Sequence, residues 1–206
     1  MKCCRIASLV LLAIVVGAAA YGAGLIRSGF SALTPPSRLE TIIARTMRRM
    51  AIPSAASKQR NPLAESAETP NVIAAGRAHW ADHCATCHGN DGSGLTQIGQ
   101  NLYPKSPDMR LSATQNLSDG ELYYIIVNGV RLTGMPAWGA AGTGEADENW
   151  YLVSFIRHLP RITPEELDEM KRLNPKTEAD RAEEQQEEEF LKGGEPSQNP
   201  EATHHH

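Results

Sequence analysis

Two thiols and an imidazole lie within five consecutive residues, Cys84-Ala85-Thr86-Cys87-His88. On one helical turn, thiols three positions apart can reach the two vinyl groups on one edge of a porphyrin, and the next side chain reaches the iron. The spacing therefore predicts one covalent haem, held by thioether bonds from Cys84 and Cys87 and with His88 as an axial iron ligand.

Two other uses of a cysteine pair fit the chain poorly. A structural zinc site needs a second pair of ligands, and no cysteine follows Cys87. A thioredoxin-like redox site needs a strand before the pair and a βαβ setting, and neither is predicted here. The haem prediction is the one that accounts for the adjacent histidine.

The sixth position of the iron needs a ligand from elsewhere in the chain. Met135, which Gly134 and Pro136 hold in a tight loop, would give a Met/His pair. Met109 is the competitor, because it follows Pro107 in the long loop that must pass the haem edge. The histidines that we also considered, and favour less, are His79, His83 and His158.

Three helices are expected to carry these residues. Apolar periodicity and capping signals predict them over 72–83, 119–128 and 147–158. The intervening stretch 89–116 is rich in Gly and Pro and contains no convincing strand. The fold class predicted from these signals is all-α.

The N-terminus contains twenty-one uncharged, mainly apolar residues, 6–26, after two basic residues. Such a stretch can span a bilayer core of about 30 Å as a helix, although a cleavable signal segment is the alternative. Either interpretation sends the rest of the chain across the membrane. The arginines that follow the stretch oppose this orientation by the positive-inside rule.

A second helix is predicted from a capping box at Ser37 and Glu40. One side of this helix is apolar and the other is rich in arginine. Helices of this kind lie on anionic lipid, pack on a partner protein or dock on their own domain, and the sequence leaves these three alternatives open. The domains expected are a membrane anchor or signal peptide at 1–30, the amphipathic helix and a linker at 31–70, the haem domain at 71–162 and an acidic, flexible tail at 163–206.

Charge divides along the same boundaries. Residues 1–60 hold nine basic and one acidic residue, 61–162 hold six and ten, and 163–206 hold five and thirteen. A net charge of −4 thus conceals a basic beginning and an acidic end, and it excludes a uniformly basic nucleic-acid-binding protein.

The stretch from about residue 72 to 160 resembles the class I c-type cytochromes. The similarity rests on Gly76 and Trp80 before the haem motif, on the loop 133–139 (Thr-Gly-Met-Pro-Ala-Trp-Gly), and on Trp150, Tyr151 and Phe155 in the last helix. It implies a fold in which the first and last helices cross beside one haem c, with Gly76 at the crossing. It further implies His88 and Met135 as axial ligands and a backbone carbonyl, that of Pro104, orienting His88.

A haem with both axial positions filled by protein exchanges electrons and does not bind substrate. We therefore expect an electron carrier, not an enzyme, in the form of a single-pass protein of the bacterial inner membrane with its haem domain in the periplasm. It would act on redox partner proteins at the bilayer, without nucleic acid, as a shuttle or as a subunit of a respiratory complex. The alternative is a peroxidase-like or gas-sensing haem protein whose sixth position is open.

Overall fold

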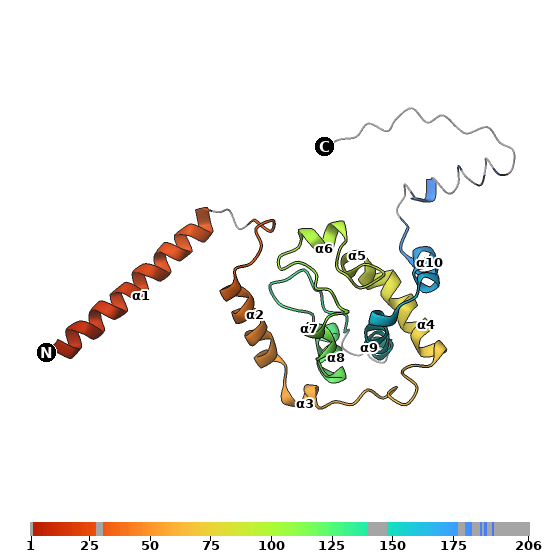
Figure 1. Cartoon of the computed structure of the whole chain (residues 1–206), viewed down its shortest axis with the longest axis horizontal. Coiled ribbons are helices and arrows are strands. Elements are labelled where there is room, and N and C mark those ends of the chain that lie inside the picture. The colour runs from red at the N-terminus through yellow and green to blue at the C-terminus, as the bar shows by residue number, and fades with distance from the viewer. Residues whose placement is uncertain are drawn as a thin grey trace.

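The computed structural model describes residues 2–27, 31–139, 148–176 and 180–182, and single residues at 186, 188 and 191. Within these residues the chain forms helices and no strand, so the predicted all-α fold is confirmed (Figure 1). The elements are α1 (Lys2–Arg27), α2 (Arg38–Ala51), α3 (Ser54–Ser57), α4 (Pro70–His79), η1 (Trp80–Cys84), α5 (Ala85–His88), α6 (Gln97–Asn101), α7 (Ser112–Gln115), α8 (Asp119–Asn128), α9 (Glu148–His158), η3 (Leu159–Arg161) and α10 (Pro164–Leu173).

Helices α4 and α9 cross at Gly76. A Cβ atom at this position would lie 2.8 Å from Cβ of Phe155 and would overlap the carbonyl oxygen of Tyr151. Only a residue without a side chain allows the two backbones to approach so closely. The expected crossing of the first and last helices of the haem domain is therefore present, with glycine at its centre.

The core fills the space beside this crossing. Trp80 and Phe155 are almost completely buried, and their rings lie 5.8 Å apart. On the other side of α9, Trp150 stacks on Tyr123 of α8 at a centroid distance of 4.1 Å. These contacts fix α4, α8 and α9 as the frame on which the loops are mounted.

Helix α2 begins at the capping box that the sequence predicts, and α8 and α10 begin in the same way. Each starts with a reciprocal pair in which a hydroxyl accepts from a backbone N–H three residues on, and a glutamate accepts from the backbone N–H of the capping residue. The pairs are Ser37 with Glu40, Ser118 with Glu121, and Thr163 with Glu166.

The long loop between α5 and α8 contains two short helices that the sequence did not predict. Helices α6 and α7 have five and four residues, too few to show an apolar period. The side-chain amide of Gln115, at the end of α7, donates to the carbonyls of Met109 (2.8 Å) and Ile156 (2.9 Å). The loop is thus fastened to α9 across the domain.

Segments on both sides of the haem domain also pack against it. In the segment that we expected to be a linker, Asn61 is buried, and the carbonyl of Ser57 accepts from the hydroxyl of Ser118 at 2.8 Å. At the other end, α10 buries Met170 completely. Most of the acidic tail beyond residue 176, with the terminal histidines, lies outside the described residues.

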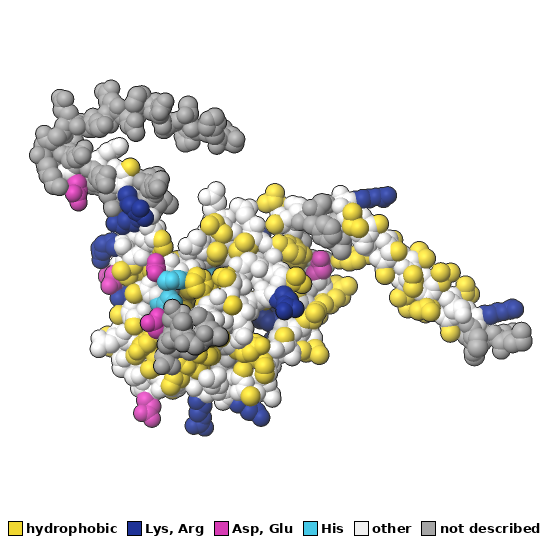
Figure 2. Space-filling model, turned by 180° about the vertical axis from the view of Figure 1, so that it is seen from behind, with side chains coloured by type: hydrophobic (Ala, Val, Ile, Leu, Met, Phe, Trp, Pro, Cys, Tyr) yellow, Lys and Arg dark blue, Asp and Glu magenta, His cyan; other side chains and the backbone are white. Residues whose placement is uncertain are grey.

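Helix α1 stands apart from this body (Figure 1). Residues Arg5–Gly24 are long and apolar enough to cross a membrane, with none of the apolar span buried within the protein. Figure 2 shows hydrophobic side chains covering the helix between basic residues at its ends.

Candidate haem site

The haem motif lies inside a continuous helical stretch. After α4 the helix widens into one π-type turn, η1, which ends at Cys84, and then resumes as α5 up to His88. Cys84 and Cys87 are free, half-buried thiols on this turn. Burial, aided by the nearby Cys87, raises the pKa of Cys84 to about 12, so this residue is a neutral thiol at physiological pH.

His88 is enclosed next to the core. Its ring centroid lies 5.6 Å from that of Trp80, whose indole N–H donates to the carbonyl of Gly89 at 3.0 Å. Burial lowers the pKa of His88, and this effect outweighs the opposing effect of the Pro107 carbonyl. The imidazole is therefore neutral, which is the form that binds metals.

The loop that contains Pro107 faces the imidazole ring of His88. Nδ1 is buried and makes no hydrogen bond of full geometry with any part of the chain that the structure describes. The backbone carbonyl that acts on this ring belongs to Pro107, not to Pro104 as the resemblance suggested.

Hydrogen bonds close this loop onto the haem motif. The N–H of Gly94 donates to the carbonyl of His88 (2.7 Å), and the hydroxyl of Thr96 donates to that of Cys87 (3.1 Å). A Cβ on Gly99 would collide with the same Cys87 carbonyl. The carbonyls at the end of α5, which the helix itself leaves unpaired, are thereby satisfied.

The loop with Met135 is mounted on the end of α8. The N–H groups of Trp138 and Gly139 each donate to α8, to the carbonyls of Ile126 and Val127, at 3.0 Å. Within the loop, Val130 N–H donates to the carbonyl of Met135 at 3.1 Å. Met135 is half-buried, at the centre of a loop with defined backbone contacts.

One aromatic contact joins the methionine loop to the haem motif. The ring of Trp138 meets that of His83 edge to face, with centroids 5.0 Å apart and planes at 80°. His83 directly precedes Cys84, and Trp138 follows Met135 by three residues. The fold therefore brings the loop of Met135 beside the residues that would bind the haem edge. Trp138 was singled out in the sequence only as part of the loop motif, and its contact with His83 could not be predicted from spacing.

Met109, the competing ligand, has a different environment. Its side chain packs against the core, and its sulfur lies 3.8 Å from the hydroxyl of Thr114. Its backbone is fixed too, because its N–H donates to the carbonyl of Gly92 at 2.8 Å. Met109 is therefore packed against the core in this structure.

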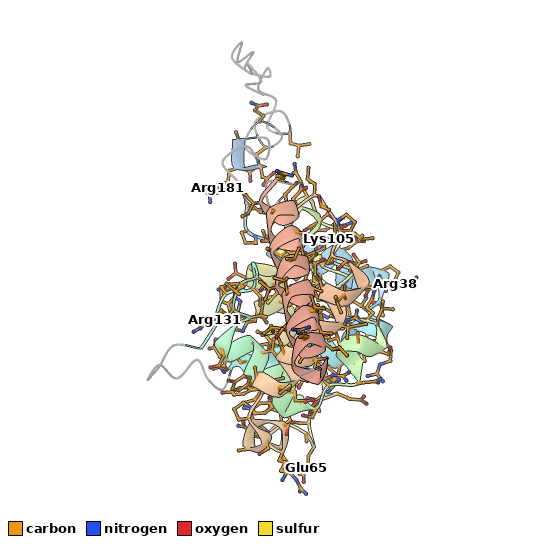
Figure 3. The ribbon with its side chains drawn as sticks, turned by 90° about the vertical axis from the view of Figure 1, so that its left-hand side faces the viewer. Arg38, Glu65, Lys105, Arg131 and Arg181 are labelled. Carbon is orange, nitrogen blue, oxygen red and sulfur yellow. The ribbon has the colours of Figure 1, made fainter. Side chains whose placement is uncertain are left out.

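The histidines that were considered as iron ligands contact other side chains, whereas Arg131 is exposed. The ring of His83 contacts that of His79 (5.0 Å) and lies 3.0 Å from an Asp82 carboxylate oxygen. His158 meets Glu166 at 2.9 Å. Arg131, considered from the sequence as a haem propionate partner or a solvated residue, is exposed, and Figure 3 shows it at the edge of the molecule.

These observations fit a covalent haem. The chain presents two unpaired thiols on one turn, a neutral, half-buried imidazole directly after them, and a methionine loop whose Trp138 contacts His83 next to the same turn. A bare metal ion is a poorer occupant, since among the residues described no three His, Cys, Asp or Glu side chains are grouped to hold one.

Comparison with known proteins supports the same class. Residues 71–156 match the family described as cytochrome C oxidase, cbb3-type, subunit III. No curated protein matches the chain. The match covers the crossing helices, the haem motif and the methionine loop. It confirms the prediction, made from the sequence, that this part of the chain is a c-type cytochrome domain.

Proposed function

We propose that this chain, in which residues 71–156 form a c-type cytochrome domain, binds one haem c with His/Met ligation and transfers single electrons at a membrane. The observation that carries the proposal is the environment of His88. This residue is a half-buried, neutral imidazole that directly follows two free thiols and lies beside the loop of a half-buried methionine.

In this assignment Cys84 and Cys87 would form the two thioether bonds, and His88 and Met135 would bind the iron. The haem supplies the one-electron chemistry, through its iron. The chain supplies binding and orientation. The enclosure of His88 between Trp80 and the Pro107 loop keeps its ring in place.

Met135 is preferred to Met109 on structural grounds. The sulfur of Met109 is directed at Thr114 and its side chain is part of the core, so its release would cost packing energy. Met135 lies on a loop whose neighbour Trp138 already contacts the haem-binding turn through His83. A thioether ligand raises the reduction potential of a haem, which suits a carrier that accepts electrons from a donor complex.

The proposed location of the haem domain is the outer face of a bacterial inner membrane. Helix α1 would span the bilayer once and hold the haem domain in the periplasm. The matched family is described as subunit III of a cbb3-type cytochrome c oxidase, which supports a role as a subunit of a respiratory complex. A free membrane-tethered shuttle would use the same domain, and co-purification from mildly solubilised membranes distinguishes the two.

The ligation is tested with the full-length holoprotein. We expect the oxidised protein to show a methionine-to-iron charge-transfer band and the reduced protein to bind carbon monoxide slowly. Met135→Ala should abolish the band and accelerate carbon monoxide binding, whereas the matched change Met109→Leu should leave both properties unchanged.

A wild-type protein without the band, or one that binds carbon monoxide at once, would overturn the carrier proposal in favour of an open haem of the gas-binding or peroxidase-like kind. Loss of the band in Met109→Leu but not in Met135→Ala would transfer the ligand role to Met109.

A further inference from the structure

Helix α2 packs against the haem domain through its polar side. Its three half-buried residues are Glu40, Thr41 and Arg48, and it has no buried residue. The phenol hydroxyl of Tyr103 donates to Glu40 at 3.3 Å. Arg48 lies close enough to Glu121 at the start of α8 for the two charges to interact.

The opposite side of α2 carries five large apolar side chains, which together we call the apolar face of α2. Between 49% and 80% of each is exposed, although they lie beside a domain with an apolar core. They are Leu39, Ile42, Ile43, Met47 and Met50. At about 100° per residue they fall within one arc of the helix, so they form one continuous stripe.

This orientation is the reverse of the one that a soluble protein adopts. A helix docked on its own domain normally buries its apolar side and exposes its charges. Here Glu40 and Arg48 occupy the contact, and the stripe faces away from the domain. A contiguous exposed apolar surface of this kind marks contact with a membrane or a partner.

Two observations indicate a membrane. The first is charge, because α2 has four arginines against one glutamate, and its exposed Arg38, Arg45 and Arg49 border the apolar face. A basic helix with one apolar side is the composition that binds anionic lipid surfaces.

The second observation is continuity with α1. Ten residues join the two helices, which limits their separation to about 35 Å even in a fully extended chain. In addition, the Tyr21 hydroxyl is close enough to Glu40 to contribute to lowering the pKa of that carboxyl, after the larger effects of Ser37 and Tyr103. Tyr21 lies near the end of the apolar span, so α2 starts at the level where α1 leaves the bilayer. In Figure 1 α2 lies on the flank of the domain nearest to α1.

We propose that α2 lies in the plane of the membrane surface, with its apolar face among the lipid chains and its exposed arginines on anionic phospholipid headgroups. The inference rests on the anchoring role proposed for α1. Its consequence is that the haem domain, which is held on the polar side of α2, is kept against the membrane surface and does not swing freely on its anchor.

Spin labels on full-length holoprotein test the inference. In a Cys3→Ser/Cys4→Ser background, Leu39→Cys and Ala44→Cys place labels on two exposed positions about 140° apart around α2. The protein is reconstituted in vesicles of phosphatidylcholine and phosphatidylglycerol, and the access of oxygen and of a water-soluble nickel complex to each label is measured by EPR.

We expect the label at position 39 to lose access to the nickel complex severalfold and to gain access to oxygen, while the label at 44 remains in water. Replacing the lipid by pure phosphatidylcholine, or adding Arg45→Gln/Arg49→Gln, should restore nickel access at 39. Equal nickel access at 39 and 44 in the anionic vesicles would overturn the inference, and so would dipolar coupling between labels at 39, because a second copy would then cover the face.

A carbonate wash separates this result from the anchoring itself. Only protein retained after the wash is measured, so a water-exposed label at 39 in retained protein counts against α2 alone. Release of the protein by the wash, with its haem spectrum intact, would instead refute anchoring by α1 and leave the electron-transfer assignment in place.

Discussion

The two sides of the candidate haem site are built in different ways. The histidine side is a helical turn between buried elements, and loop hydrogen bonds close on the carbonyls of Cys87 and His88. The methionine side is a surface loop in which Leu132 is 92% exposed. It is held by backbone bonds to α8 and by the contact of Trp138 with His83.

Because they are built differently, the two sides should respond differently to substitutions. The histidine side is over-determined by its surroundings, so it can hold a covalent cofactor in one position. The methionine side depends on few contacts, so it can be loosened without unfolding the domain. Changes on the first side should therefore cost holoprotein or stability, and changes on the second should alter mainly the ligation.

The largest effect is expected for His88→Ala. Without the proximal ligand the haem has no fixed position on its turn, and we expect the yield of holoprotein to fall by about tenfold or more. The measurement is the Soret absorbance per mole of chain, together with haem staining after denaturation. His79→Ala, on the same helical stretch, is the control and should retain its haem. A wild-type yield for His88→Ala would refute the assignment of this residue.

A matched pair of glycine substitutions compares the two sides directly. A Cβ on Gly99 collides with the backbone carbonyl of Cys87, whereas one on Gly134 meets only the end of the Leu102 side chain, at 2.7 Å. We expect Gly99→Ala to lower the free energy of unfolding by about 1–3 kcal/mol and Gly134→Ala by about 0.5 kcal/mol or less. Chemical denaturation of the holoproteins measures both, and equal losses would contradict the comparison.

The next effect concerns the contact that joins the two sides. Trp138→Ala removes the aromatic contact between the methionine loop and His83 and should lower the free energy of unfolding by about 0.5–1.5 kcal/mol beyond the lost burial. Because the loop of Met135 is then less restrained, carbon monoxide should bind the reduced protein faster than in wild type. Trp138→Phe retains a ring and should behave nearly as wild type. If Trp138→Ala changes stability but not the rate of carbon monoxide binding, the contact does not position the methionine.

The smallest effect is expected away from the site, at α10. Arg77 pairs with Glu166 at 2.9 Å, and His158 meets the same carboxylate. Burial alone would raise the pKa of Glu166, but hydrogen bonds from His158 and Thr163 and the charge of Arg77 outweigh it and hold the pKa below its ordinary value of 4.5. A lowered carboxylate pKa stabilises the fold above the unfolded-state value, and this contribution is lost as the pH falls through the folded-state value.

Glu166→Gln should therefore cost about 1 kcal/mol at neutral pH and reduce the loss of stability in acid. Both sides of the haem site should be unaffected, as judged by the charge-transfer band. Asp168→Asn, which breaks an exposed pair with Lys171, is the control and should change nothing measurable. An unaltered acid profile in Glu166→Gln would show that another group dominates it.

The sequence was sufficient for everything that depends on neighbours along the chain. The haem motif needs only one helical turn, so residues 84–88 are enough to identify it. Reciprocal caps such as Ser118 with Glu121 mark where helices start. The apolar length of α1 and the all-α class follow from composition and periodicity in the same way. Helices α6 and α7 escaped prediction because four or five residues cannot display a period.

Only the tertiary structure could decide what depends on residues far apart in the chain. The surroundings of Met109 and Met135 differ, because Met109 lies against the core and the loop of Met135 lies beside the turn that Trp138 contacts through His83. The carbonyl facing His88 came from Pro107 because the path of a long loop, not its composition, sets which residue arrives there. The amphipathic pattern of α2 predicted two faces, but which of them meets the domain is a matter of docking, and the polar face does.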